Sequence, residues 1–116
     1  MFRFVRSKQE KKLSKKIRAS LFGLAVGDAL GLALAQVSRK TLVDNPVRDM
    51  QAFGTYNQAA GTWAEPSSLS FCLAEALTHE FSLNNIGLNF VYWFQENYWT
   101  ARAKHFDIDE QTKLAC

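Results

Sequence analysis

Apolar residues recur at helical spacing over most of the chain. Between residues 13 and 35 they fall three or four positions apart, which places their side chains on one face of a helix. This spacing predicts a first helix over residues 9–36, with a buried face formed by Leu13, Ile17, Leu21, Leu24, Asp28, Gly31 and Ala35. Its second half is rich in glycine and alanine, and glycine weakens helices, so packing must stabilise it.

Two more helices follow from local signals. Proline is favoured at the first helical position, so a second helix is predicted to start near Pro66. Ser82 is the predicted N-cap of a third helix, whose buried face is Ile86, Phe90, Trp93, Phe94 and Asn97. Residues 38–62, punctuated by proline and glycine, predict an irregular loop. The polar tail predicts one further short helix.

No segment alternates in the manner of a strand, so the predicted fold class is all-α, a small helical bundle. The length fits one domain, residues 1–116, with residues 1–12 as a basic N-terminal arm. Two cysteines, Cys72 and Cys116, form no disulfide framework, which favours reduced thiols in the cytoplasm. No apolar run reaches the ~18 residues of a membrane helix, so no membrane association is expected.

The net charge of +3 is unevenly distributed. Residues 1–20 carry a net charge of +7, and the remaining 96 residues carry −4. This basic segment could bind nucleic acid or an acidic protein face, or be a solvated terminus. Its candidate binding residues are Arg3, Arg6, Lys8, Lys11, Lys12, Lys15, Lys16 and Arg18. The aromatic residues between 90 and 99 could stack on bases, although their helical spacing is more typical of a core.

Several kinds of site find no support in the sequence. His79 and His105 lie far apart and no C-x-x-C accompanies them, which argues against zinc. There is no G-x-S-x-G nucleophile motif and no glycine-rich phosphate loop.

Two features remain as candidates for chemistry. Asp28 lies on the apolar face of the first helix, where a buried carboxylate must be paired, must hydrogen-bond backbone or must bind a metal. The stretch GTWAEPSSL places Glu65 and two serines at a helix start, where backbone N–H groups favour anions. The alternative is a plain helix start, in which Glu65 complements the helix dipole and Ser67 or Ser68 provides the cap.

Taken together, two stretches resemble the ADP-ribosylglycohydrolase family. IRASLFGLAVGDALGLALAQ is similar to the family's first helix, which carries G-D-A-L-G, and GTWAEPSSLSFCLAEAL is similar to its G-x-W-[ST]-D-D-[ST] turn and helix. NFVYWFQENYW resembles the helix that follows, so the match covers about residues 17–108. The resemblance implies an all-α fold and removal of ADP-ribose from modified side chains or small molecules. It also implies two magnesium ions, held by the Thr-Asp-Asp turn and a C-terminal acidic motif.

Carried over by position, the resemblance indicates lost ligands. The glutamate that follows G-D-A-L-G falls at Ala35, while Ala64, Glu65 and Pro66 stand at the Thr-Asp-Asp positions. Ser67 keeps the next hydroxyl, and the C-terminal acidic motif has no match. We therefore expect a vestigial site at Asp28, Ala35, Ala64, Glu65, Pro66 and Ser67, with no catalytic residue and no metal or other cofactor. On this interpretation the chain is a pseudoenzyme.

The leading hypothesis is a truncated, non-catalytic relative that acts by binding a macromolecule. A protein or ribonucleoprotein partner is expected, for example a CRISPR nuclease inhibited by a phage-type anti-CRISPR protein. A homo-oligomer could cover the truncated face. One alternative is an ADP-ribose or nucleotide sensor that keeps Asp28, Trp63 and Ser67; another is an RNA-binding module that uses the basic arm.

Overall fold

The computed structural model describes residues 7–106 and 108–115, and within them it is helical. The helices are α1 (Lys8–Leu32), α2 (Arg39–Asp44), α3 (Glu65–Ala76), α4 (Leu83–Glu96) and α5 (Glu110–Ala115). No strand occurs in these described ranges; one isolated bridge joins Phe53 and Gln58. The all-α prediction is confirmed, as are the predicted helix starts near residues 66 and 82 and the short helix in the tail.

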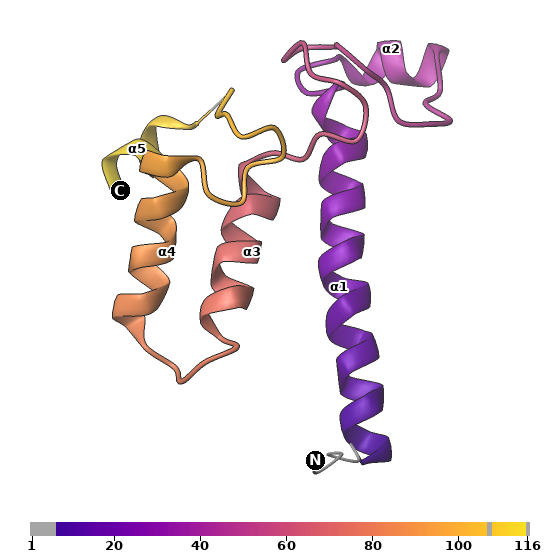
Figure 1. The fold of residues 1–116 in the computed structure, drawn as a ribbon. Coiled ribbons are helices and arrows are strands. Elements are labelled where there is room, and N and C mark those ends of the chain that lie inside the picture. The colour runs from indigo at the N-terminus through magenta and orange to yellow at the C-terminus, as the bar shows by residue number, and fades with distance from the viewer. Residues whose placement is uncertain (1–6, 107, 116) are drawn as a thin grey trace.

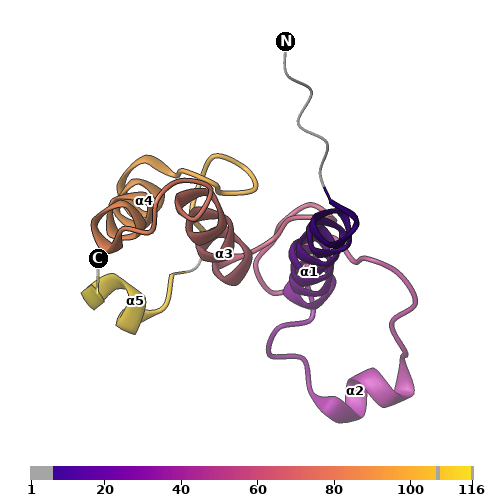
Figure 2. The same cartoon turned by 90° about the horizontal axis from the view of Figure 1, so that it is seen from below.

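Helix α3 lies between α1 and α4 and packs on both (Figure 1). Seen from below, α1 stands on the side of α3 away from α4, and α2 projects outward from the end of α1 (Figure 2). The amino-terminal half of α1 runs past the level of the α3–α4 pair (Figure 1). No described helix is long and apolar enough to cross a membrane.

Helices α1, α2 and α4 each begin with a serine cap from their own sequence. At α1, the Ser7 hydroxyl accepts from the Glu10 N–H at 3.1 Å, and the Glu10 carboxylate accepts from the Ser7 N–H at 2.6 Å. At α4, the Ser82 hydroxyl accepts from the Asn85 N–H at 3.3 Å, as predicted. Helix α3 differs, because its N-cap residue is Ala64, which has no side chain that can accept a hydrogen bond.

Two helix boundaries differ from the prediction. Helix α1 ends at Leu32 instead of continuing to residue 36, since the chain turns there and Gln36 has a φ of 66°. The predicted irregular loop contains α2, which Ser38 caps by accepting from the Thr41 N–H at 3.1 Å. Such a short helix lacks the repeated apolar spacing by which longer helices are recognised.

The predicted buried face of α1 is wrong over its first half and also at Leu24 and Gly31, which are exposed. Leu13 and Ile17 are 56% and 52% exposed, and the buried residues of α1 are Ala29 and Leu32. Helix α3 is the described helix that packs on α1. The buried residues of α1 lie in its last two turns, because α3 covers α1 there. The described residues therefore leave the apolar side chains of the first half of α1 uncovered.

The core lies between α3 and α4. Trp93 is 1% exposed, and Cys72 and Ser67 are fully buried. The Asn89 amide donates to the Cys72 carbonyl at 3.0 Å and joins the two helices. The His105 ring stands edge-on to the Trp93 indole at 4.7 Å, and its Nε2 lies 2.7 Å from the Trp93 carbonyl. The segment after α4 thus closes over the open end of the helix pair.

Candidate functional site

The start of α3 is held by a carboxylate from α1. Asp28 Oδ2 accepts from the backbone N–H of Ala64 at 3.0 Å and from the backbone N–H of Ser67 at 3.3 Å. The same oxygen accepts from the Ser67 hydroxyl at 2.5 Å. These backbone donors lack partners within their own helix, so Asp28 does from another helix what an N-cap side chain does locally. A negative charge there also complements the helix dipole.

This arrangement decides between the alternatives left open by the sequence. Asp28 hydrogen-bonds backbone, but the backbone is that of a segment 36 residues away rather than its own. The prediction that Ser67 or Ser68 caps α3 is wrong. Both hydroxyls donate instead, Ser67 to Asp28 and Ser68 to the Ala64 carbonyl at 3.2 Å. The capping oxygen comes from Asp28 because no side chain at Ala64 can supply one.

Glu65, the first residue of α3, is half-buried and is held from the far end of the chain. Its Oε1 accepts from the Thr112 hydroxyl of α5 at 2.5 Å. Thr112 is in turn fixed by Asp109, whose Oδ1 accepts from the Thr112 N–H at 3.0 Å. The backbone and side-chain hydrogen bonds of Thr112 lower the pKa of the Asp109 carboxyl. Asp109 and Thr112 were not predicted from the sequence, because they belong to no recognisable motif.

Aromatic side chains contact α3 at a place separate from the Glu65–Thr112 contact. The Trp63 indole donates to the Trp99 carbonyl at 3.2 Å and meets the Phe71 ring edge-on at 5.6 Å. On the same side, the Glu75 carboxylate accepts from the Tyr98 hydroxyl at 2.8 Å and from the Trp99 indole at 3.0 Å. The hydrogen bond to Glu75 raises the pKa of Tyr98. These contacts fasten the segment after α4 to α3.

Another polar contact ties the loop before α3 to the segment after α4. Arg102 Nε donates to the buried Thr62 hydroxyl at 3.2 Å. Thr62 donates in turn to the Ala59 carbonyl at 2.7 Å. Both ends of the turn that contains Glu65 are therefore anchored.

The described residues by themselves do not fit a magnesium site. Of the three positions expected to hold metal ligands, Glu65 alone bears a carboxylate, and it already accepts from Thr112. Nowhere in residues 7–106 and 108–115 do three or more histidine, cysteine, aspartate or glutamate side chains gather in a way that could hold a metal ion. Mg²⁺ needs an octahedral set of oxygen ligands, which this turn does not supply.

The other predicted residues lie apart from this turn. Ala35 follows the end of α1, where its carbonyl accepts from the Thr55 hydroxyl. Arg3 and Arg6 lie outside the described residues. The remaining basic candidates are exposed on the first half of α1; they are Lys8, Lys11, Lys12, Lys15, Lys16 and Arg18. They form a charged surface that is separate from the Asp28–Ser67 contact.

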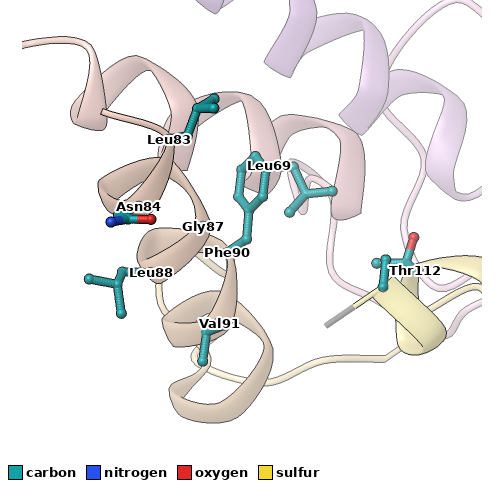
Figure 3. Close-up of a pocket in the computed structure, with 9 residues that line it drawn as sticks. Leu69, Leu83, Asn84, Gly87, Leu88, Phe90, Val91 and Thr112 are labelled. Atoms are coloured by element: carbon teal, nitrogen blue, oxygen red, sulfur yellow. The ribbon is translucent and has the colours of Figure 1, made fainter. Parts of the chain in front are cut away.

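A groove of about 720 Å³ lies between α4 and α5. Leu69 of α3, Phe90 of α4 and Thr112 of α5 project toward it (Figure 3). Its other lining residues are apolar or uncharged: Leu83, Asn84, Gly87, Leu88, Val91 and Ala115. Because no cationic side chain lines it, the groove offers no charge to pair with a phosphate.

Comparison with known proteins supports the family resemblance seen in the sequence. The sequence model of the ADP-ribosylglycohydrolase family matches residues 9–116, almost the whole chain. The chain belongs to the ADP-ribosylglycohydrolase family. It is 29% identical over 102 residues to the ADP-ribosylarginine hydrolase Tri1 of Pseudomonas putida (strain GB-1) and equally to that of Serratia proteamaculans (strain 568). Each match covers 86% of this chain and 27% of the relative. No solved structure matches it significantly.

The chain thus spans about a quarter of the length of these curated relatives. Both are named for hydrolysis, and this finding overturns the expectation that the chain is not an enzyme. That expectation rested on the substituted residues at 35, 64 and 66, on the unmatched C-terminal acidic motif and on the short chain. The substitutions leave the Glu65 carboxylate and the Asp28 contact in place. Substitution of expected ligands was therefore too weak a ground for excluding hydrolysis.

Proposed function

We propose that this chain forms part of a hydrolase that cleaves the bond between ADP-ribose and an arginine side chain. The carrying observation is the triple hydrogen bond of Asp28 to Ala64 and Ser67, which fixes the turn before α3 against α1. The names of the two relatives support arginine as the modified residue. This turn is the part of the active site that we assign to the chain.

Within this proposal, Asp28 positions the turn and Glu65 carries the proton. In the hydrolysis, a water oxygen bonds to the sugar carbon as the bond from that carbon to the guanidinium nitrogen breaks. The proton lost by the water passes to Glu65 and then to the released arginine, which is general acid–base chemistry. Glu65 suits this role because it is half-buried at the turn and Thr112 engages one of its two oxygens.

The test is release of ADP-ribose from an arginine-ADP-ribosylated protein, measured by chromatography. We expect turnover by the protein and a loss of at least about 100-fold in Glu65→Gln, in keeping with the contribution of a general base. Ser70→Ala is the matched control, since Ser70 is near Glu65 in α3 but donates only to the Pro66 carbonyl. Absence of turnover by the folded protein, or full activity in Glu65→Gln, contradicts the proposal.

A second candidate function is binding of single-stranded RNA by the first half of α1. The supporting observation is the exposure of its six basic side chains beside the exposed Leu13 and Ile17. Binding should weaken with salt, with log K falling by roughly 0.7 per phosphate contact for each unit of log salt concentration. Replacing Lys11, Lys12, Lys15 and Lys16 by alanine should abolish it, whereas alanine at the exposed Arg39 and Lys40 of α2 should not.

The finer prediction of an anti-CRISPR inhibitor stays a prediction. Neither relative reported above is named for nuclease inhibition. Binding to an effector nuclease in a purified two-component assay, lost in the same four-lysine variant, is the result that would support it.

A further inference from the structure

The Trp93 indole carries a buried donor that has no acceptor within the protein. Trp93 is 1% exposed, and among residues 7–106 and 108–115 its Nε1 is the one buried side-chain nitrogen or oxygen without a hydrogen-bond partner. The backbone of the same residue differs, because its carbonyl accepts from His105 Nε2 at 2.7 Å. Buried polar groups in folded proteins are nearly always paired, either with protein groups or with ordered water. The indole N–H therefore needs an acceptor.

Trp93 lines a small cavity at the start of α3. The cavity has a volume of about 10 Å³ and is lined by residues of the first turn of α3 and of the segment 100–106. Glu65, Ser68 and Thr100 are among its polar lining residues. The hydroxyls of Ser68 and Thr100 donate their hydrogens to backbone carbonyls, at 3.2 Å and 2.7 Å, and their oxygens keep lone pairs that can accept. The cavity thus combines one unused donor with several acceptors.

Size and hydrogen bonding together select the occupant of this cavity. One water molecule needs roughly 10–15 Å³ of such space, so a sugar, a phosphate or any larger group does not fit. A cation cannot accept from Trp93, and an anion would stand beside the Glu65 carboxylate. Lys104 also lines the cavity, but its side chain is exposed to solvent. A neutral molecule that both accepts and donates satisfies the lining, and water does both.

We propose that this cavity binds one water molecule, which accepts from the Trp93 indole N–H and donates to the polar groups at the start of α3. The water joins α4 to the turn that carries Glu65, whose other contacts reach α1 through Asp28 and α5 through Thr112. The turn is then connected to the α3–α4 core as well as to these two helices. The inference does not rest on the proposed hydrolysis, because it concerns how a buried donor is satisfied.

Nuclear Overhauser effects between water and the full chain, labelled with nitrogen-15 at tryptophan, test the site. The chain has three tryptophans, and Trp63→Phe and Trp99→Phe assign their indole signals and leave that of Trp93. We expect the Trp93 indole hydrogen to show a cross-peak with water of the sign given by a long-lived bound molecule. Trp99 is the internal control, since its N–H donates to Glu75 at 3.0 Å and the residue is 41% exposed, where surface water exchanges quickly. Absence of the Trp93 cross-peak would overturn the proposal.

A high-resolution crystal structure of the full chain is an independent test. We expect one water within about 2.7–3.2 Å of Trp93 Nε1, inside the cavity. The water should be lost in Trp93→Phe, which removes the donor, and should remain in the matched Trp99→Phe. An Nε1 that donates to a protein oxygen, or a water that persists in Trp93→Phe, would contradict the assignment. Neither measurement uses enzymatic turnover, so failure of this inference is distinguishable from failure of the proposed function.

Discussion

Asp28 on α1 binds Ser67 on α3 twice, through the backbone N–H at 3.3 Å and through the hydroxyl at 2.5 Å. One carboxylate oxygen therefore fixes both the backbone and the side chain of the same residue. Because the two residues are 39 positions apart in the chain, the contact joins two helices as well as capping one of them.

The Asp28 contact should contribute measurably to stability. Asp28→Ala removes the acceptor of three hydrogen bonds and leaves the buried donors of Ser67 without a partner. Hydrogen bonds to a charged group contribute roughly 1.5–3 kcal/mol, so the free energy of unfolding should fall by about that amount. Urea denaturation measures it. The exposed Asp44 provides the control: Asp44→Ala should leave the midpoint almost unchanged.

Ser67→Ala isolates the hydroxyl. The variant keeps the backbone contact to Asp28 and loses the side-chain donor. A cost of roughly 1.5 kcal/mol, the lower end of the range for a hydrogen bond to a charged group, is expected. Ser70→Ala, on the exposed side of the same helix, should cost less than ~0.5 kcal/mol. Equal denaturation midpoints for the two variants would mean that the Ser67 hydroxyl adds nothing to the contact.

Alanine substitution of two leucines tests which part of α1 packs against the rest of the protein. Leu32 is buried and Leu13 is 56% exposed, although the sequence pattern placed Leu13 on the buried face. Leu32→Ala should destabilise the protein by about 2–4 kcal/mol, the range for buried leucines. Leu13→Ala should change stability by less than ~0.5 kcal/mol. The opposite ranking in thermal unfolding would indicate that α1 packs through its first half.

Burial raises the pKa of the Cys72 thiol to about 11. In a Cys116→Ser background, the folded protein should react with iodoacetamide at pH 8 on the order of 100-fold more slowly than the unfolded chain, because thiolate is the reactive form. Since the thiol ionises at a lower pH when unfolded, Cys72 contributes stability below about pH 9 that is lost as the pH rises toward 11. In Cys72→Ala, the free energy of unfolding should not show this decrease between pH 9 and 11. If the difference in unfolding free energy between the proteins with and without Cys72 does not change with pH, the prediction is wrong.

Local signals predicted much of the fold. Pro66 and Ser82 act on the residues next to them, so the sequence alone located the starts of α3 and α4. The extent of burial along α1 could not be read in this way, because its periodicity specifies a face but not which part of that face α3 covers. Helix α2 was missed because it lies in a stretch punctuated by proline and glycine, which predicted an irregular loop.

The candidate site was predictable only in part. The resemblance singled out Asp28, Glu65 and Ser67, and the structure brings Asp28 to Ser67. The sequence could not show that Thr112 contacts Glu65, because the two residues are 47 positions apart and Thr112 belongs to no recognisable motif. Nor could it show that Asp28 serves the backbone of Ala64, since the identity of Ala64 carries no information about an N–H group.

Because Ala64 has no side chain that can cap α3, the start of this helix depends on Asp28 of α1 for its capping oxygen. A peptide containing only residues 61–97 would keep the contacts between α3 and α4 but would fray where α3 begins, because its capping oxygen lies on α1. The capping of this turn in the folded protein therefore depends on the docking of α1. A substitution that weakens the packing of α1 on α3 should therefore also loosen the first turn of α3.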